Sequence, residues 1–175
     1  MEEFLKSVEK KAFRMIQIAT GNTDDAMDLL QDSMMSFVRK YSDKMESDWK
    51  PLFYRVVQNR IRDWYRREKI KRLFFIQMPP RYDGPESQTD PMESIEDKSA
   101  VDSLAVLKTS QAMEKLNNVL RGLPARQQQV FLLRSWEGLS TEETAKAMGC
   151  TQGTVKTHYF RAITKLKHEL EGTWP

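Results

Sequence analysis

Apolar residues recur every three or four positions along most of this chain, which is the spacing of an amphipathic helix and not the alternation of a strand. The spacing predicts helices over residues 2–20, 24–41 and 51–75, the second capped by Thr23 and the third opened by Pro51, with residues 42–49 as a loop. Further helices are expected from about Leu104 and from Pro124. No stretch alternates like a strand, so the expected fold class is all-α.

The helical pattern stops between residues 77 and 103. This segment contains four prolines and few apolar residues, and residues 76–103 carry seven acidic against two basic side chains. Such a composition buries too little apolar surface to fold, so we expect a flexible acidic linker. The linker would divide the chain into two small helical domains, residues 1–76 and 104–175.

Charge is distributed unevenly, although the net charge of the 175 residues is only +3. Residues 1–75 carry 16 basic and 12 acidic side chains, and residues 104–175 carry 10 and 6. Two basic domains on either side of an acidic linker would suit a two-point contact with nucleic acid.

Composition disfavours several classes of protein. The single cysteine, Cys150, excludes an internal disulfide and is expected to be a packing residue in a reducing compartment. No segment has the apolar length to span a membrane, and the charged start MEEFLKSVEKK is not a signal peptide, so we expect a cytoplasmic protein without membrane insertion. The sequence contains no metal-ligand cluster, phosphate-binding loop or nucleophile–base pair, so it predicts neither a cofactor nor an enzyme.

The stretch from Glu137 to Leu170, EGLSTEETAKAMGCTQGTVKTHYFRAITKLKHEL, has the pattern of a helix-turn-helix. Ser140 can cap a short helix with Glu143 as its reciprocal partner, Gly149 suits the turn, and Thr151 can cap a second, longer helix. One face of the second helix is apolar and consists of Val155, Tyr159, Ala162, Leu166 and Leu170, with Ile163 at its edge.

The outward face of that second helix carries groups suited to DNA. In a helix-turn-helix the start of the second helix touches base edges, and lysine, arginine and threonine suit guanine acceptors, phosphates and thymine methyls. The outward residues are Thr157, Arg161, Thr164, Lys165 and His168, with Lys156 and Phe160 at the margin. The alternative interpretation is an ordinary amphipathic hairpin with a solvated basic face.

The C-terminal half of the third helix is crowded with basic residues beside Trp64 and Tyr65. Basic side chains next to aromatic rings suit a surface that follows a nucleic-acid backbone and stacks unpaired bases. A surface helix whose long basic side chains reach into solvent is the alternative. The basic residues are Arg60, Arg62, Arg66, Arg67, Lys69, Lys71 and Arg72.

The second helix presents a different feature, an acidic and polar patch around one leucine. Its inward positions are expected to be Ala26, Met27, Leu30, Met34, Phe37, Val38 and Tyr41. This assignment leaves Leu29 exposed beside Asp28, Gln31 and Asp32. The patch is interpreted either as a solvated face or as a docking site for a basic partner.

The order of these segments resembles one family, the extracytoplasmic-function (ECF, group IV) sigma factors of bacterial RNA polymerase. The resemblance spans about residues 8–170. TGNTDDAMDLLQDSM resembles regions 2.1–2.2, LFYRVVQNRIRDWYRR resembles regions 2.3–2.4, and the segment from Leu123 to Leu166 resembles region 4, including the Gly-Thr-Val that begins its recognition helix.

For the N-terminal domain, the resemblance implies contacts with polymerase and with the promoter's −10 element. Asn59 would contact the upstream edge of that element, the loop from Met45 to Trp49 would help to hold a flipped base, and capture of that base would drive strand opening. The −10 and melting set implied is Trp49, Asn59, Arg60, Arg62, Asp63, Tyr65, Arg66 and Arg67. The set implied to bind the clamp coiled coil of the largest polymerase subunit is Asp28, Leu29, Gln31, Asp32 and Met35.

For the C-terminal domain, the resemblance implies recognition of the −35 element and contact with the flap of the second-largest subunit. The residues implied are Arg134, Lys156, Thr157, His158, Phe160 and Arg161. The acidic linker would run toward the RNA exit channel, and an anti-sigma factor is an expected partner. The family often has arginine where Lys156 and His158 stand, and a tryptophan where Leu52 stands, which leaves the promoter sequence open.

Two other functions compete with a sigma factor. A stand-alone helix-turn-helix regulator would form a dimer that reads a palindrome. It would not account for the patch around Leu29 or for the basic third helix. An enzyme is disfavoured because the sequence shows no catalytic constellation.

Overall fold

The computed structural model describes residues 1–77 and 103–171, so the linker expected between residues 77 and 103 lies almost entirely outside the described residues. The described residues are helical and contain no strand, which confirms the all-α prediction. The first half contains α1 (Glu2–Thr20), α2 (Thr23–Tyr41) and α3 (Glu46–Gln77). The second half contains α4 (Ser103–Arg121), α5 (Ala125–Phe131), the π-helical turn η1 (Leu132–Trp136), α6 (Thr141–Met148) and α7 (Gln152–Leu170).

The first half is a three-helix unit closed by aromatic packing. The ring of Phe37 on α2 lies 5.5 Å from that of Phe53 on α3 and 5.6 Å from that of Phe4 on α1, and both Phe37 and Phe53 are fully buried. Gly21 separates α1 from α2 with a φ of 72°, a conformation that glycine adopts without strain. The cap of α2 is Asn22 and not Thr23, because the Asn22 side chain accepts a hydrogen bond from the Asp25 amide, and asparagine is the stronger capping residue.

The start of α3 differs from the prediction. The helix begins at Glu46, so residues 46–49 are helical and the loop is shorter than expected. Trp49 fixes this start, because its indole Nε1 donates to the Lys44 carbonyl at 2.9 Å and its ring packs 5.6 Å from that of Phe4. Pro51 is therefore inside α3 and not at its first position, near enough to the start that only one early helix hydrogen bond is lost.

The second half is built around the predicted helix-turn-helix. The Ser140 hydroxyl accepts from the Glu143 amide and the Glu143 carboxylate accepts from the Ser140 amide, so the capping box is present. Gly149 ends α6 with a φ of 62°, and the Thr151 hydroxyl accepts from the Thr154 amide to cap α7. All three predictions are confirmed.

A π-helical turn changes the register before the helix-turn-helix. In η1 the Glu137 amide donates to the Leu132 carbonyl, five residues back. The wider turn leaves Trp136 37% exposed and brings Leu132 into the core at 1% exposed. Met113 of α4 is exposed as well.

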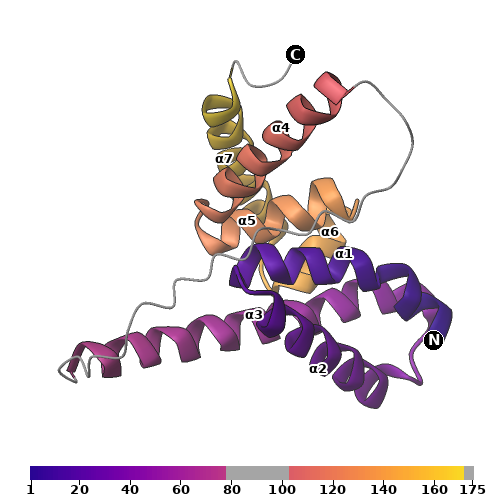
Figure 1. The fold of residues 1–175 in the computed structure, drawn as a ribbon. Coiled ribbons are helices and arrows are strands. Elements are labelled where there is room, and N and C mark those ends of the chain that lie inside the picture. The colour runs from indigo at the N-terminus through magenta and orange to yellow at the C-terminus, as the bar shows by residue number, and fades with distance from the viewer. Residues whose placement is uncertain (78–102, 172–175) are drawn as a thin grey trace.

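The two halves pack against each other instead of lying apart. Figure 1 shows α4–α7 above α1–α3, with the C-terminal part of α3 extending beyond the other helices. The principal contact joins α3 to α6, and α1 also touches α4 and α5. Lys50 of α3 lies 2.9 Å from the carboxylate of Glu137, and Gln58 of α3 donates to Gln129 of α5 at 2.8 Å.

Candidate nucleic-acid interface

Helix α7 has one buried apolar face and one exposed polar face, as the sequence predicts. Val155, Ala162 and Leu166 are at most 5% exposed and hold α7 against α5 and α6. Lys156, Thr157, Phe160 and Arg161 are exposed, Phe160 at 71%. An exposed phenylalanine between exposed cations suits contact with a base or a sugar, because burial against DNA would remove its apolar ring from water.

His158 and Arg134 are placed differently from the other residues expected to contact DNA. His158 is half-buried, and burial, with smaller contributions from Arg126 and Arg161, lowers the pKa of its imidazole, so the ring is neutral near pH 7. Arg134 donates through Nη1 to the Leu139 carbonyl, and its guanidinium lies 5.6 Å from the centre of the Tyr159 ring. Arg134 therefore supports the start of the helix-turn-helix, and its contact with DNA stays a prediction.

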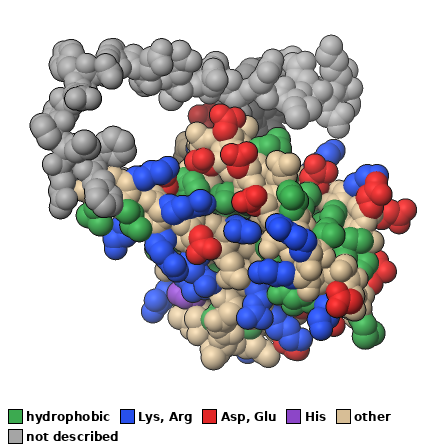
Figure 2. Space-filling view, turned by 90° about the horizontal axis from the view of Figure 1, so that it is seen from below, with side chains coloured by type: hydrophobic (Ala, Val, Ile, Leu, Met, Phe, Trp, Pro, Cys, Tyr) green, Lys and Arg blue, Asp and Glu red, His purple; other side chains and the backbone are tan. Residues whose placement is uncertain are grey.

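Helix α3 has an exposed polar face beyond its packed N-terminal half. Asn59, Arg62, Asp63, Arg66 and Arg67 are exposed, at the three- and four-residue spacing that places them on one side. Arg55, which the sequence analysis did not select, precedes Asn59 by one turn on the same side and is exposed too. The four-residue spacing between Arg55 and Asn59 is the sequence feature from which Arg55 could have been assigned to this face. Figure 2 shows lysine and arginine side chains gathered across the middle of one face of the molecule.

Two residues expected at the melting site, Trp49 and Tyr65, have packing roles, as does Trp64 beside them. The Tyr65 hydroxyl donates to the Ala19 carbonyl at 2.9 Å, and burial raises the pKa of this phenol. Trp64 donates to the Asp25 carboxylate at 3.1 Å, which joins α3 to the start of α2. Trp49 is half-buried and Arg60 is half-buried at the flank of the exposed face. These contacts hold α3 in place, so that its polar face has a fixed position.

The buried side of α2 differs from the one that the sequence predicts. Leu29 is 4% exposed and belongs to the core, so the prediction of an exposed leucine is wrong. Met27 and Val38, expected inward, are instead 54% and 37% exposed. The buried face of α2 includes Ser33 and Ser36, whose small side chains allow close packing, and the Ser33 hydroxyl donates to the Leu29 carbonyl.

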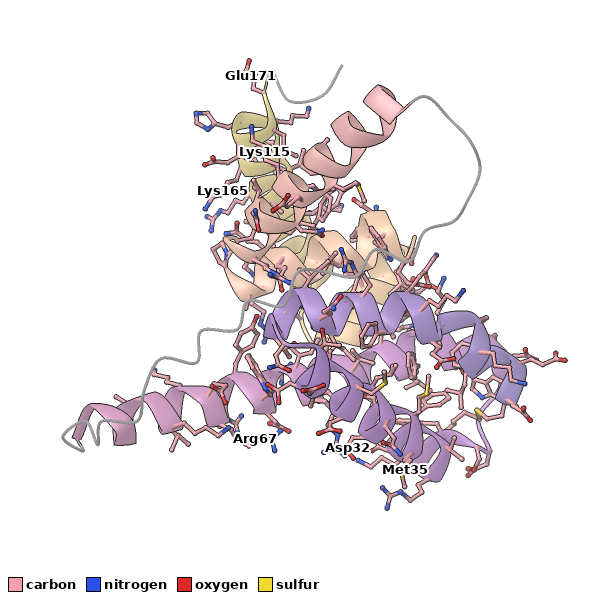
Figure 3. The ribbon with its side chains drawn as sticks, in the orientation of Figure 1. Asp32, Met35, Arg67, Lys115, Lys165 and Glu171 are labelled. Atoms are coloured by element: carbon pink, nitrogen blue, oxygen red, sulfur yellow. The ribbon has the colours of Figure 1, made fainter. Side chains whose placement is uncertain are left out.

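The exposed face of α2 is consequently apolar as well as acidic. Met27, Met35 and Val38 share it with Gln31, and the exposed Asp28 and Asp32 lie along its edge. Figure 3 shows Asp32 and Met35 pointing away from α2 on the same side of the molecule as Arg67 of α3. The buried face of α2 could have been identified from the three- and four-residue spacing that joins Leu29, Ser33, Ser36 and Phe37.

Residues 1–77 and 103–171 contain no group of three or more histidine, cysteine, aspartate or glutamate side chains placed to hold a metal ion. Burial raises the pKa of the Cys150 thiol, which keeps it protonated. No helix in this part of the chain is both long and apolar enough to cross a membrane.

Two family models match the two halves. The model of Sigma-70 region 2 matches residues 1–70, which include α1, α2 and most of α3. The model of Sigma-70, region 4 matches residues 113–166, which include α6 and most of α7. The exposed faces of α2 and α3 therefore lie in the segment matched by region 2, and the exposed face of α7 lies in the segment matched by region 4.

Known proteins resemble most of the chain. It is 30% identical to the RNA polymerase sigma-E factor of Streptomyces avermitilis, over 97% of this chain and 84% of that protein. It is 42% identical over 59 residues to the ECF RNA polymerase sigma factor SigD of Mycobacterium tuberculosis, 34% of this chain and 28% of that one. Among solved structures, the sigma factor RpoE of Bartonella quintana, in complex with the anti-sigma factor NepR, is similar with a TM-score of 0.71, over 98% of this chain and 96% of that one. Its sequence identity is 20%, so this likeness concerns the fold.

Proposed function

We propose that this chain, which belongs to the ECF group of the sigma-70 family, reads two promoter elements and opens the promoter DNA together with RNA polymerase. Members of this family direct RNA polymerase to promoters and are not enzymes themselves. One observation carries the proposal. Two exposed polar faces suited to DNA lie on different helices, α7 and α3, and a third, apolar and acidic face lies on α2.

Helix α7 would read the −35 element. Lys156, Thr157, Phe160 and Arg161 lie within the first ten residues of the helix, which is the part of a recognition helix that enters the major groove. Arg161 is the strongest candidate for a guanine, because its guanidinium can donate two parallel hydrogen bonds to O6 and N7. His158 is neutral, so it would contribute to recognition of the −35 element through its shape and not through a charge. The second half would also contact the flap of the second-largest polymerase subunit.

Helix α3 would bind the −10 element and the separating strand. Asn59 offers an amide that can pair with an adenine edge, and Arg62, Arg66 and Arg67 would contact phosphates of the displaced strand. Arg55 extends the same face by one turn. Capture of an extruded base would offset the few kcal/mol that unstacking costs, so opening would require no ATP.

The exposed face of α2 would dock on the clamp coiled coil of the largest polymerase subunit. Met27, Met35 and Val38 supply apolar area and Asp28 and Asp32 supply charge, which together suit a partner helix with apolar and basic residues. Leu29 would act from the core, by holding α2 in position. The site of action would be the bacterial cytoplasm, where the polymerase is.

An anti-sigma factor is a further proposed partner. Support comes from the structural neighbour, which was solved with one. A partner that holds the two halves together would prevent them from reaching two separate promoter elements.

In vitro transcription tests the proposed function. Bacterial core polymerase is incubated with and without the protein on a pool of genomic fragments, and the transcript starts are mapped. Starts that require the protein, preceded by two shared sequence blocks, support the proposal. Absence of such starts, together with tight dimeric binding to free duplex DNA, would indicate a stand-alone regulator instead.

A further inference from the structure

We propose that Met27 and Met35, on the exposed face of α2, form an oxidation site at which a peroxide converts both thioethers to sulfoxides and thereby weakens docking on RNA polymerase. The inference rests on the proposed function for its consequence, because this face of α2 is the one proposed to contact polymerase. The reaction itself depends only on the two side chains in the free chain.

Exposure separates these two sulfur atoms from those of the core. Met27 and Met35 are 54% and 53% exposed and lie about two turns apart along α2. Figure 3 shows Met35 pointing away from the helix. By contrast, Met15 and Met148 are 1% and 2% exposed. A dissolved peroxide therefore reaches the sulfur atoms of α2 in the folded chain, whereas it reaches those of the core only after local unfolding.

The modification is a two-electron oxygen transfer. A lone pair of the thioether sulfur attacks one oxygen of hydrogen peroxide, so that an S–O bond forms as the O–O bond breaks. The departing hydroxide takes the proton from the transferred oxygen and leaves as water. Each thioether and one peroxide thus give one sulfoxide and one water, with the sulfur oxidised and the peroxide reduced.

Oxidation changes the chemistry of the face that is proposed to dock. Two of its three exposed apolar side chains are thioethers, and the third is Val38. A thioether is soft and apolar, whereas a sulfoxide is polar and its oxygen accepts hydrogen bonds. Docking would then have to remove water from two new polar oxygens, which is unfavourable unless each finds a donor on the partner. The sulfoxide form should therefore bind polymerase more weakly.

Two other exposed methionines lie outside this face and serve as references. Met45 is 73% exposed between α2 and α3, and Met113 is 36% exposed on α4. We expect a peroxide to reach both of them, because their sulfur atoms are also outside the core. They therefore distinguish oxidation of α2 from oxidation of exposed methionine in general.

Mass spectrometry of the free chain locates the modification. The full chain carries Cys150→Ser, so that its one thiol does not react, and is treated with hydrogen peroxide for increasing times. Peptide masses should show sulfoxide at Met27 and Met35 well before Met15 and Met148. Helical circular dichroism should not change at that stage, because the modified side chains are exposed.

Affinity for untreated core polymerase measures the consequence. After removal of the peroxide, the oxidised protein should bind roughly tenfold more weakly, and treatment with methionine sulfoxide reductases should restore its affinity. Each variant is compared with itself before and after oxidation. Met27→Leu with Met35→Leu should show little change, whereas Met45→Leu with Met113→Leu should lose as much affinity as the parent.

Three results would overturn the inference. One is sulfoxide that appears at Met15 and Met148 as early as on α2, and another is an unchanged dissociation constant once Met27 and Met35 are oxidised. The third is an equal loss of affinity in the two leucine pairs. Untreated protein that does not bind polymerase would contradict the proposed function, whereas the order of oxidation would still decide whether Met27 and Met35 are the reactive sites.

Discussion

The Gln58 amide on α3 donates to the Gln129 side-chain oxygen on α5 at 2.8 Å, and this bond joins two halves of the chain inside a shared core. Replacing Gln58 by methionine leaves that oxygen buried without its donor. We expect Gln58→Met to lower the free energy of unfolding by about 1–3 kcal/mol, measured by urea denaturation. Gln31→Met, at an exposed amide, is the control and should change it little. Equal effects of the two substitutions would show that the buried bond contributes nothing.

Leu29 and Met35 should separate folding from polymerase binding. Leu29 is 4% exposed, so Leu29→Ala should cost about 2–5 kcal/mol in the free energy of unfolding. Met35 is 53% exposed, so Met35→Ala should leave stability nearly unchanged but weaken the affinity for core polymerase. Titration of labelled protein with core polymerase measures the second effect. An unaltered dissociation constant for Met35→Ala and for Asp32→Ala would remove α2 from the polymerase contact.

Arg161 should determine base preference in the −35 element. A bidentate contact with guanine is worth about 1–3 kcal/mol, so Arg161→Ala should reduce transcription by roughly 5- to 150-fold and relax the preference at one base pair. Lys167→Ala provides the comparison, because Lys167 is an exposed cation nearer the end of α7. A panel of promoters with single changes in the −35 element gives the measurement. An unchanged preference profile for Arg161→Ala would contradict the assigned role.

The capping box should make the second half less stable in acid. Hydrogen bonds from the backbone and side chain of Ser140 lower the pKa of Glu143. The stabilisation is therefore complete above the pKa of Glu143 in the unfolded chain, about 4.3, and is lost as the pH falls through the lower folded value. Glutamine keeps the acceptor without titrating, so Glu143→Gln should remove part of the acid sensitivity of urea denaturation. Parallel pH profiles for both proteins would exclude a contribution from Glu143.

Sequence reasoning was most successful where the determinants are local. The caps Ser140 and Thr151 and the turn at Gly149 each depend on residues within a few positions, and the structure confirms all three. The face of α2 was assigned wrongly because apolar residues occupy most of its circumference, and only packing against α1 and α3 selects the side with Leu29. The choice of face was thus a tertiary effect.

Contacts distant in sequence could not be predicted at all. Lys50 and Glu137 are 87 positions apart, and each looks like an ordinary surface residue in its own segment. The π-helical turn that positions Glu137 also has no simple sequence pattern, and it leaves Trp136 exposed. The linker and the individual DNA contacts stay predictions.

Permanganate reactivity of thymines near −10 tests the central claim most directly. On a promoter mapped by transcription, the protein with core polymerase should make these thymines reactive without ATP, and core polymerase alone should not. Asn59→Ala should reduce this reactivity while leaving the complex assembled, because it removes an exposed amide from the side of α3 that we propose to face DNA. Thymines that stay unreactive with the parent protein, or that react equally without it, would contradict the account.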